Sequence, residues 1–304
     1  MRAVTWRAYG SPEVLTIRDV PVPEPRDGEV RIRTVATTAH IGDTRIRRAD
    51  PFAARLAFGL LRPRRDLILG LELAGTVDAV GRGVSAFAPG DEVLAFCGFS
   101  RLGGNAEYRC LPAEGGNLPK HGAVVRKPAS LSFAEAAALP TGALTALKNL
   151  QKARLGAGGS ILINGASGSL GTYAIQLAKH LGAEVTAVCS ARNRDLVAGL
   201  GADAVVDYEA QDFTRLGPRF DVVYDAVMQS SPRACRGLLR PGGVHVRNAG
   251  LARITNDDLT HIADLAAQGA LRPVIDRVLP LDDVVEAHRY VETGRKRGHV
   301  VLTM

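Results

Sequence analysis

The segment 161–181 changes character abruptly and limits what the chain can fold into. Residues 161–163 are apolar, and residues 165–171 (GASGSLG) contain three glycines. From Leu170 onward, Tyr173, Leu177 and Leu181 recur at three- and four-residue steps, which is the apolar spacing of a helix. The segment therefore predicts a strand, a tight turn and a helix, the unit from which alternating α/β sheets are built.

The turn carries an incomplete dinucleotide fingerprint. The usual pattern is G-x-G-x-x-G, and its three glycine positions are Ala166, Gly168 and Gly171 here. Such glycines let backbone N–H groups approach a pyrophosphate, whose negative charge the helix N-terminus favours. They can also serve close packing alone. We expect a dinucleotide site whose turn residues are Ala166, Ser167, Gly168, Ser169, Leu170 and Gly171.

The alternation of strands and helices continues after this unit. Residues 184–189 have the pattern of a strand, and residues 193–200 have that of a helix closed by Gly201. Further short β-branched runs occur at 204–206, 222–224 and 244–246. This order predicts a parallel, doubly wound sheet.

The first part of the chain has a different pattern. Residues 14–20 and 29–35 alternate apolar and polar side chains, and the β pattern continues at 76–81 and 90–95. We expect a small antiparallel barrel. Ser132 and Glu135 form a capping-box pattern at the start of a helix. The tail, 274–302, returns to a strand–helix–strand pattern and is expected to rejoin the first domain.

Composition excludes several functional classes. The chain has 304 residues, 46% of them apolar, and no apolar run approaches the ~18 residues of a membrane span. The N-terminus lacks the apolar core of a signal peptide. Four cysteines without C-x-x-C spacing indicate reduced thiols in a cytoplasmic protein rather than a disulfide framework or a metal knot.

The charge is +7 at pH 7, and only six of the 38 basic residues are lysines. The arginines are spread along the chain without a clustered tract or interleaved aromatic residues, so we expect no nucleic-acid partner. A basic surface favours an anionic cofactor or substrate through electrostatic steering.

Motifs along nearly the whole chain resemble those of the medium-chain dehydrogenase/reductase superfamily, in its zinc-free, quinone oxidoreductase-like branch. They include YGSPEVL at 9–15, GLELAG at 70–75, PGDEV at 89–93, EAAALP at 135–140, LGAD at 200–203, PGG at 241–243 and LRPVI at 271–275. The resemblance implies a GroES-like catalytic domain formed by 1–125 and 273–304. It also implies a Rossmann NADP-binding domain formed by 126–272.

The resemblance also implies that zinc is absent. Zinc-dependent relatives hold catalytic zinc with a cysteine, a histidine and a second cysteine. The three corresponding positions are His40, Leu71 and about Thr141. Leucine cannot ligate a metal, and one potential ligand of three leaves no site. Only Cys97 and Cys110 lie where a structural zinc lobe would need four cysteines.

His40 is the candidate catalytic residue. Quinone oxidoreductases usually carry asparagine at this position, in the active-site cleft. A histidine there could hydrogen-bond a substrate carbonyl or donate a proton near neutral pH; equally, it could only pack against the cleft. The neighbouring Asp43 is expected to fix the local loop.

The resemblance and the end of the second Rossmann strand favour NADPH over NADH. NAD-selective sheets end this strand with Asp or Glu, but residues 188–193 contain no carboxylate. Ser190 could hydrogen-bond the 2′-phosphate and Arg192 could pair with it, although Arg192 could also simply begin a solvated helix. Lys179 matches a lysine that contacts this phosphate in related enzymes. Thr145 is expected near the nicotinamide ribose, and Val227, Met228, Asn248 and Gly250 on the nicotinamide side.

Two segments differ from the family pattern. Residues 50–66 mix apolar residues with arginines and are expected to pack over the substrate cleft rather than to touch a membrane. Residues 250–256 are too few for the sixth Rossmann strand, through which relatives commonly dimerise. We therefore expect five strands, and a monomer or a homodimer that uses another surface.

These observations predict an NADPH-dependent reductase that transfers a hydride to a small molecule, either a quinone or an α,β-unsaturated carbonyl compound. The alternative is a non-redox member of the family, which binds the cofactor structurally or uses its pocket for a cyclisation or rearrangement.

Overall fold

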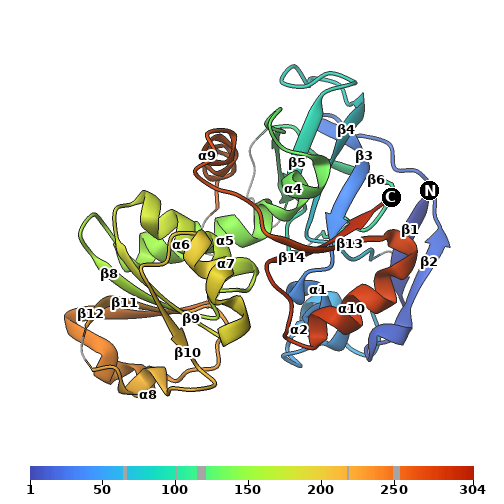
Figure 1. The fold of residues 1–304 in the computed structure, drawn as a ribbon. Coiled ribbons are helices and arrows are strands. Elements are labelled where there is room, and N and C mark those ends of the chain that lie inside the picture. The colour runs from blue at the N-terminus through green and yellow to red at the C-terminus, as the bar shows by residue number, and fades with distance from the viewer. Residues whose placement is uncertain (64–66, 100, 115–120, 218, 249–253) are drawn as a thin grey trace. The chain divides into compact units, whose positions relative to one another are not determined.

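The computed structural model describes residues 1–63, 67–99, 101–114, 121–217, 219–248 and 254–304. The chain forms two compact units (Figure 1). The first contains Met1–Thr141, Arg253–Ala267 and Ile275–Met304, and the second contains Gly142–Ala252 and Gln268–Val274. Within these described ranges, no helix has the length and apolar character needed to cross a membrane.

A mixed sheet forms the centre of the first unit. Its strands follow the order β13 (Ile275–Pro280), β14 (His299–Thr303), β3 (Glu29–Thr38), β4 (Glu72–Val80), β5 (Glu92–Phe96) and β7 (Ala123–Arg126), and β6 (Tyr108–Pro112) also pairs with β3. All these pairs are antiparallel except β13 with β14. Strands β1 (Arg2–Trp6) and β2 (Leu15–Asp19) form a separate antiparallel pair. The pairing of β14 with β3 confirms that the C-terminal tail rejoins the first part of the chain.

The helices of this unit are α1 (Ile41–Arg48), α2 (Ala54–Phe58), α4 (Phe133–Ala138), α9 (Asn256–Ala267) and α10 (Val284–Glu292). Helix α4 begins with the predicted capping box. The Glu135 N–H donates to the Ser132 hydroxyl at 3.3 Å, and the Ser132 N–H donates to the Glu135 carboxylate at 2.9 Å.

The compact units differ from the domain limits that the sequence suggests. The predicted limits assign residues 126–272 to the nucleotide-binding domain. In the structure, however, α4 packs on β3 and β4, and α9 packs against β7. Both helices belong to the first unit because of these packing contacts, although the sequence places them within residues 126–272.

A parallel sheet forms the second unit. Its order is β10 (Ala204–Asp207), β9 (Glu184–Cys189), β8 (Ser160–Asn164), β11 (Phe220–Asp225) and β12 (Leu239–Arg247), as Figure 1 shows. Helices α5 (Pro140–Ala153), α6 (Ser169–His180), α7 (Arg194–Gly199) and α8 (Pro232–Cys235) accompany these strands. The five parallel strands confirm the predicted doubly wound sheet. The predicted gap at the sixth strand coincides partly with residues 249–253, which lie outside the described residues.

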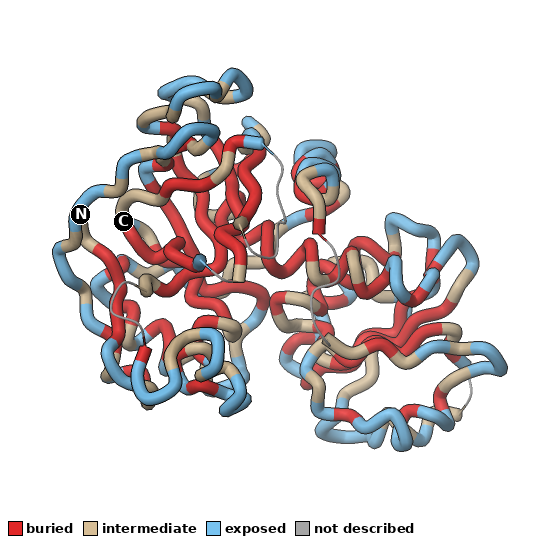
Figure 2. Tube along the Cα trace, turned by 180° about the vertical axis from the view of Figure 1, so that it is seen from behind, coloured by how far each residue is buried: buried red, intermediate tan, exposed pale blue. Residues whose placement is uncertain are grey.

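The order of the strands determines where this sheet can bind a ligand. The chain runs outward from β8 through β9 to β10 and then returns to β11 on the other side of β8. Ligands of such sheets bind beyond the carboxyl ends of the strands at this reversal. Strand β8 is buried along its whole length. Figure 2 shows such buried segments, in red, inside each unit.

Candidate functional site

The turn after β8 is shaped by two glycines that the fold itself requires. Gly165 has φ +80°, and an added Cβ would lie 2.4 Å from Cγ1 of Val227. An added Cβ at Gly171 would lie 2.3 Å from the carbonyl oxygen of Gly165. Both distances are far below van der Waals contact, so these glycines let the turn and the start of α6 lie against each other.

Gly168 is different, because no contact with the described part of the chain requires it to be glycine. Its φ is −82°, and an added Cβ would meet only the Gly165 carbonyl oxygen, at an ordinary 3.4 Å. It is the N-cap of α6 and supplies no side-chain hydrogen bond. Its backbone therefore offers a surface that a methyl group would cover, at the end of a 12-residue helix whose dipole favours an anion. A pyrophosphate fits this arrangement.

Ala166 occupies the first glycine position of the fingerprint and is fully buried. Its methyl group is accommodated within the turn, so the departure from G-x-G-x-x-G leaves the fold intact. Ser169 and Leu170 begin α6 beside Gly168. The structure therefore brings the predicted turn residues together.

Hydrogen bonds fix the carboxyl ends of the two central strands. The Asn164 carboxamide donates to Asp225 at 3.1 Å. The other oxygen of Asp225 accepts from the backbone N–H and the hydroxyl of Ser230, at 2.8 and 2.7 Å. These contacts hold the loop that carries Val227, one of the predicted cofactor contacts. Asn164 and Asp225 were not among the predicted site residues, although each is a polar residue at the end of an apolar strand.

Asn248, another predicted contact, uses its side chain inside the unit. Its carboxamide oxygen accepts from the Tyr224 hydroxyl at 2.8 Å and from Asn149 at 2.9 Å. Its nitrogen donates to the Ala226 carbonyl at 2.7 Å. Its side chain is therefore engaged in orienting the end of β12. Thr145 lies half-buried on α5, and Gly250 lies outside the described residues.

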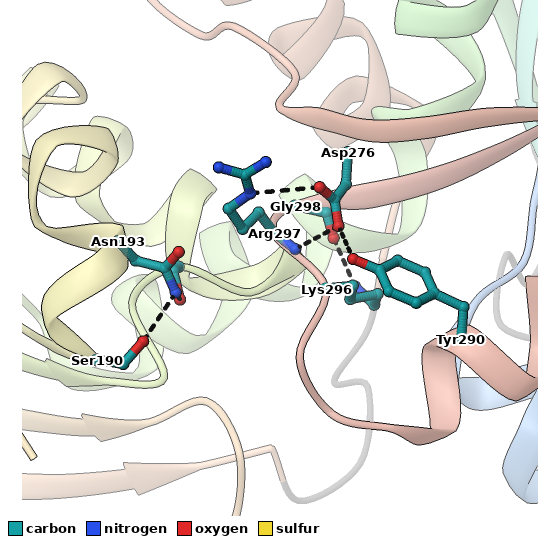
Figure 3. A network of polar contacts seen from close by, with 8 residues as sticks. Ser190, Asn193, Asp276, Tyr290, Lys296, Arg297 and Gly298 are labelled. Carbon is teal, nitrogen blue, oxygen red and sulfur yellow. Dashed lines mark hydrogen bonds and ion pairs between the residues drawn. The ribbon is translucent and has the colours of Figure 1, made fainter. Parts of the chain in front are cut away.

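The end of β9 is tied to the nucleotide turn. The Asn193 carboxamide donates to the Ser167 hydroxyl at 2.9 Å and to the Ser190 hydroxyl at 3.3 Å (Figure 3). Ser190 is buried, whereas Arg192 is exposed and makes no ion pair among the residues that the structure describes. The end of β9 therefore places the Ser190 hydroxyl close in sequence to the exposed guanidinium of Arg192.

Lys179 already has a partner. Its ammonium group lies 2.8 and 2.9 Å from the two carboxylate oxygens of Asp203, which also accepts from the Val185 N–H at 2.7 Å. This ion pair links α6 to the segment before β10. The phosphate contact that the resemblance assigns to Lys179 therefore competes with a structural role.

In the first unit, His40 caps α1. Its Nδ1 accepts a hydrogen bond from the Gly42 N–H at 2.9 Å. Asp43 in turn accepts from the His40 N–H at 3.3 Å and from the Gly70 N–H at 3.1 Å. Burial raises the pKa of Asp43 to about 7, although both backbone hydrogen bonds oppose the shift. As predicted, Asp43 fixes the local loop.

The residues at the positions of the zinc ligands make other contacts in the structure. Leu71 packs in an apolar cluster with Trp6 and Leu302. Thr141 donates its backbone N–H to Glu72 at 2.6 Å, and the Thr38 hydroxyl donates to the other Glu72 oxygen, also at 2.6 Å. Within the described ranges, no three His, Cys, Asp or Glu side chains lie close enough to hold a metal ion. Of the three positions, only His40 carries a side chain of the kind that zinc takes as a ligand.

Buried charged groups near His40 were not found from the sequence. Burial lowers the pKa of Lys296 to about 8, and the nearby Asp276 and Glu72 carboxylates oppose the shift. Figure 3 shows the adjoining network, in which Asp276 accepts from the Tyr290 hydroxyl at 2.6 Å and from the Arg297 N–H at 2.9 Å. The sequence did contain one signal for this buried charge. Lys296 lies just before the apolar strand β14, in a chain that has few lysines.

The prediction that residues 50–66 pack over a cleft was wrong for several of the described side chains, and residues 64–66 lie outside the described residues. Phe52, Leu56, Leu60 and Leu61 are exposed by 59–88% instead of packing over a pocket. Phe58 does pack on the apolar cluster of this unit. Helix α2, which lies in this segment, is short because Gly59 ends it after five residues.

Comparisons with known proteins place the chain in a family. Residues 26–148 match the alcohol dehydrogenase GroES-like domain, and residues 169–270 and 247–302 match zinc-binding dehydrogenase families. The chain is 35% identical to the 2-methylene-furan-3-one reductase of Solanum lycopersicum, over 99% of the chain and 79% of that protein. It is 30% identical, with the same coverage, to the NADPH-dependent alkenal/one oxidoreductase of Arabidopsis thaliana.

A solved structure agrees with these relatives. The quinone oxidoreductase of Coxiella burnetii superimposes with a TM-score of 0.85 at 28% identity, over 100% of this chain and 99% of that one. The matches support an oxidoreductase that uses a nicotinamide cofactor and acts on a small molecule. The chain belongs to the medium-chain dehydrogenase/reductase superfamily, with a GroES-like domain and a Rossmann sheet, and is quinone oxidoreductase-like.

Proposed function

We propose that the protein is an NADPH-dependent reductase that works without zinc and transfers a hydride to a quinone or an α,β-unsaturated carbonyl compound. One observation carries the proposal: the turn at Gly168 presents bare backbone at the N-terminus of α6, where the fold has no need of a glycine. Relatives named for quinones, alkenals and enones support the substrate class.

The cofactor supplies the hydride when it is bound, and the residues of this chain hold it. Backbone N–H groups of the first turn of α6 would receive the pyrophosphate, since the Gly168 N–H already donates to the Gly165 carbonyl oxygen at 3.1 Å. Val227 and the backbone at Asn248 would contact the nicotinamide half, and Thr145 would contact its ribose. The hydrogen bonds of Asp225 and Tyr224 hold these contacts rigidly.

The preference for NADPH rests on Ser190 and Arg192, because β9 ends without a carboxylate. Arg192→Ala should raise the Kd of NADPH about ten- to a hundredfold, which corresponds to a charged hydrogen bond of ~1.5–3 kcal/mol. The Kd of NADH should stay unchanged, since NADH lacks the 2′-phosphate. Fluorescence titration measures both constants.

The control for this experiment is Arg215→Ala, which removes another exposed arginine of the same unit. It should leave both constants unchanged and so exclude a general effect of positive charge. Equal Kd values of NADPH and NADH in the wild-type protein would contradict the proposed selectivity.

Zinc independence rests on Leu71 and on the absence of a suitable donor set among the described side chains. The purified protein should contain far less than one zinc per chain by elemental analysis. Incubation with a chelator should leave turnover intact. One tightly bound zinc per chain whose removal abolishes activity would overturn this part of the proposal.

Steady-state oxidation of NADPH with a panel of quinones and enones tests the proposed reaction itself. We expect turnover with at least one member of the panel. Tight binding of NADPH without any turnover would instead support a non-redox role on the same scaffold.

We further propose a monomer, or a homodimer that does not join Rossmann sheets at a sixth strand. In the described residues, β12 is the last strand of the sheet, and only eight residues separate it from α9. Light scattering gives the mass, and a crystal structure of any dimer shows its contact. A sixth strand paired across the two-fold axis would refute the proposal.

A further inference from the structure

The imidazole of His40 is held by one nitrogen and leaves the other without a partner. The side chain is buried, and its Nδ1 accepts from the Gly42 N–H at 2.9 Å. Its Nε2 is also buried and has no hydrogen-bond partner among the residues that the structure describes. A buried polar atom without a partner is uncommon in folded proteins and calls for an explanation.

The hydrogen bond from Gly42 fixes the position of the ring proton. A backbone N–H can only donate, so Nδ1 must present its lone pair. In the neutral ring the proton therefore lies on Nε2, which becomes a donor.

Two neighbours maintain this geometry. An added Cβ at Gly42 would lie 2.9 Å from Nδ1 and 2.7 Å from Cδ1 of Leu71, so only glycine lets the ring lie this close to the backbone. Asp43 holds the first turn of α1 by accepting from the His40 N–H and linking it to Gly70.

The surroundings disfavour a second proton on the ring. Burial, and then the positive charges of Lys296 and Arg45, lower the pKa of His40 to about 3. His299 is also buried nearby, and its pKa lies well below the ordinary value. The carboxyl groups of Asp43 and Glu72 are engaged in hydrogen bonds to Gly70, Thr38 and Thr141. His40 is therefore neutral at physiological pH.

We propose that His40 is a neutral hydrogen-bond donor whose Nε2–H binds the carbonyl oxygen of the substrate, and that it keeps its proton throughout the reaction. The proposal rests on the reductase function proposed above. It deepens that function by defining the substrate as one that presents a hydrogen-bond acceptor, since a buried donor is left unpaired by a substrate without one.

The step balances without a proton from His40. A hydride adds to the β-carbon of an enone, and the carbon–carbon π electrons shift to form an enolate. Negative charge develops on the oxygen that accepts from Nε2–H, where a positioned donor stabilises it. Water then protonates the α-carbon, so one NADPH and one proton yield NADP⁺ and the saturated carbonyl compound.

The first test is the tautomer itself. Two-dimensional NMR of ¹⁵N-histidine-labelled protein distinguishes Nε2–H, Nδ1–H and charged rings, and the His40→Asn variant identifies the His40 signals. We expect the neutral Nε2–H form between pH 8 and pH 5. An Nδ1–H ring, or a charged ring at pH 6, would overturn the proposal whether or not the enzyme is active.

The second test separates donation from packing. His40→Leu should lower kcat about a hundredfold or more, with the Kd of NADPH unchanged. His40→Asn should stay within tenfold of wild type, because a carboxamide can cap α1 through its oxygen and donate through its nitrogen. The control is His288→Leu, for which kcat should not change. His288 is a buried histidine of α10, and neither of its nitrogens has a hydrogen-bond partner within the described ranges.

The pH profile distinguishes a donor from an acid. Wild type and His40→Asn should give kcat profiles of the same shape between pH 5 and pH 8. An inflection that is present in wild type and absent in His40→Asn would make His40 a general acid and overturn the proposal. Equal kcat in wild type and His40→Leu would refute the proposed role of His40 but not the reductase function. A wild-type protein that reduces no quinone or enone would refute the reductase function itself.

Discussion

At the scale of single residues, the glycines of the nucleotide turn have different physical reasons to be glycine. Gly171 is required by the protein, because any side chain would overlap the backbone of Gly165 and Ala166. At Gly168 the described residues leave room for a methyl group, so we attribute its glycine to a ligand that approaches its backbone. A substitution at Gly171 therefore tests the stability of the protein, and a substitution at Gly168 tests the binding of the cofactor.

Gly171→Ala should lower the free energy of unfolding by about 1–3 kcal/mol, since the added methyl group overpacks the turn. Gly168→Ala should leave this free energy within about 0.5 kcal/mol and raise the Kd of NADPH at least tenfold. Urea unfolding and fluorescence titration measure the two effects. If Gly168→Ala binds NADPH as tightly as wild type, the pyrophosphate does not lie against this residue.

The sequence predicted which residues form the turn. It did not predict which hydrogen bonds and ion pairs the other candidate cofactor contacts make. Spacing and glycine content depend on neighbours along the chain, which a sequence shows directly. The roles of Asn248 and Lys179 depend on Tyr224, Asn149 and Asp203, which are distant in sequence or belong to other elements. Local patterns contain no signal for such contacts.

At the scale of elements, the capping box of α4 shows what local sequence can decide. Ser132 and Glu135 satisfy each other's backbone N–H groups, as their spacing predicted. The parallel strands were predictable for a similar reason, because buried strands are continuous apolar runs. The partly wrong prediction for residues 50–66 has the opposite cause. An apolar pattern does not show whether a partner surface exists, and Leu56 and Leu61 find none among the described residues.

Ser132→Ala should lower the free energy of unfolding by about 1 kcal/mol, because the Glu135 N–H loses its acceptor. Ser132→Thr should retain most of it, since threonine can also cap. Chemical denaturation of the three proteins gives the comparison. No difference between Ser132→Ala and wild type would show that solvent replaces this cap at no cost.

At the scale of the whole molecule, buried histidines couple stability to pH. Burial, and then the positive charge of Arg47, lower the pKa of His288 to about 3. Below pH 6.5 the unfolded chain binds a proton that the folded chain excludes, so the contribution of His288 is complete above pH 6.5 and declines as the pH falls toward 3. His40 and His299 act in the same direction, whereas the raised pKa of Asp43 acts in the opposite one.

Comparison with His288→Leu isolates one of these histidines. Between pH 6.5 and pH 5, wild type should lose about 1.6 kcal/mol more stability than this variant. The slope approaches ~1.4 kcal/mol for each pH unit once the unfolded histidine is fully protonated. Urea unfolding of both proteins at the two pH values measures the difference. Equal losses would mean that His288 is accessible to water in the folded protein.

The family assignment leaves the chemistry to be shown directly, and tracing the hydride does so. NADPH carrying deuterium at carbon 4, prepared separately with each of the two stereochemical labels, is incubated with the enzyme and an enone. The proposed mechanism predicts that one of the two labels appears at the β-carbon of the saturated product by NMR, with an α-hydrogen derived from water. A reduced product without deuterium from either cofactor, or no reduced product with any quinone or enone, would contradict it.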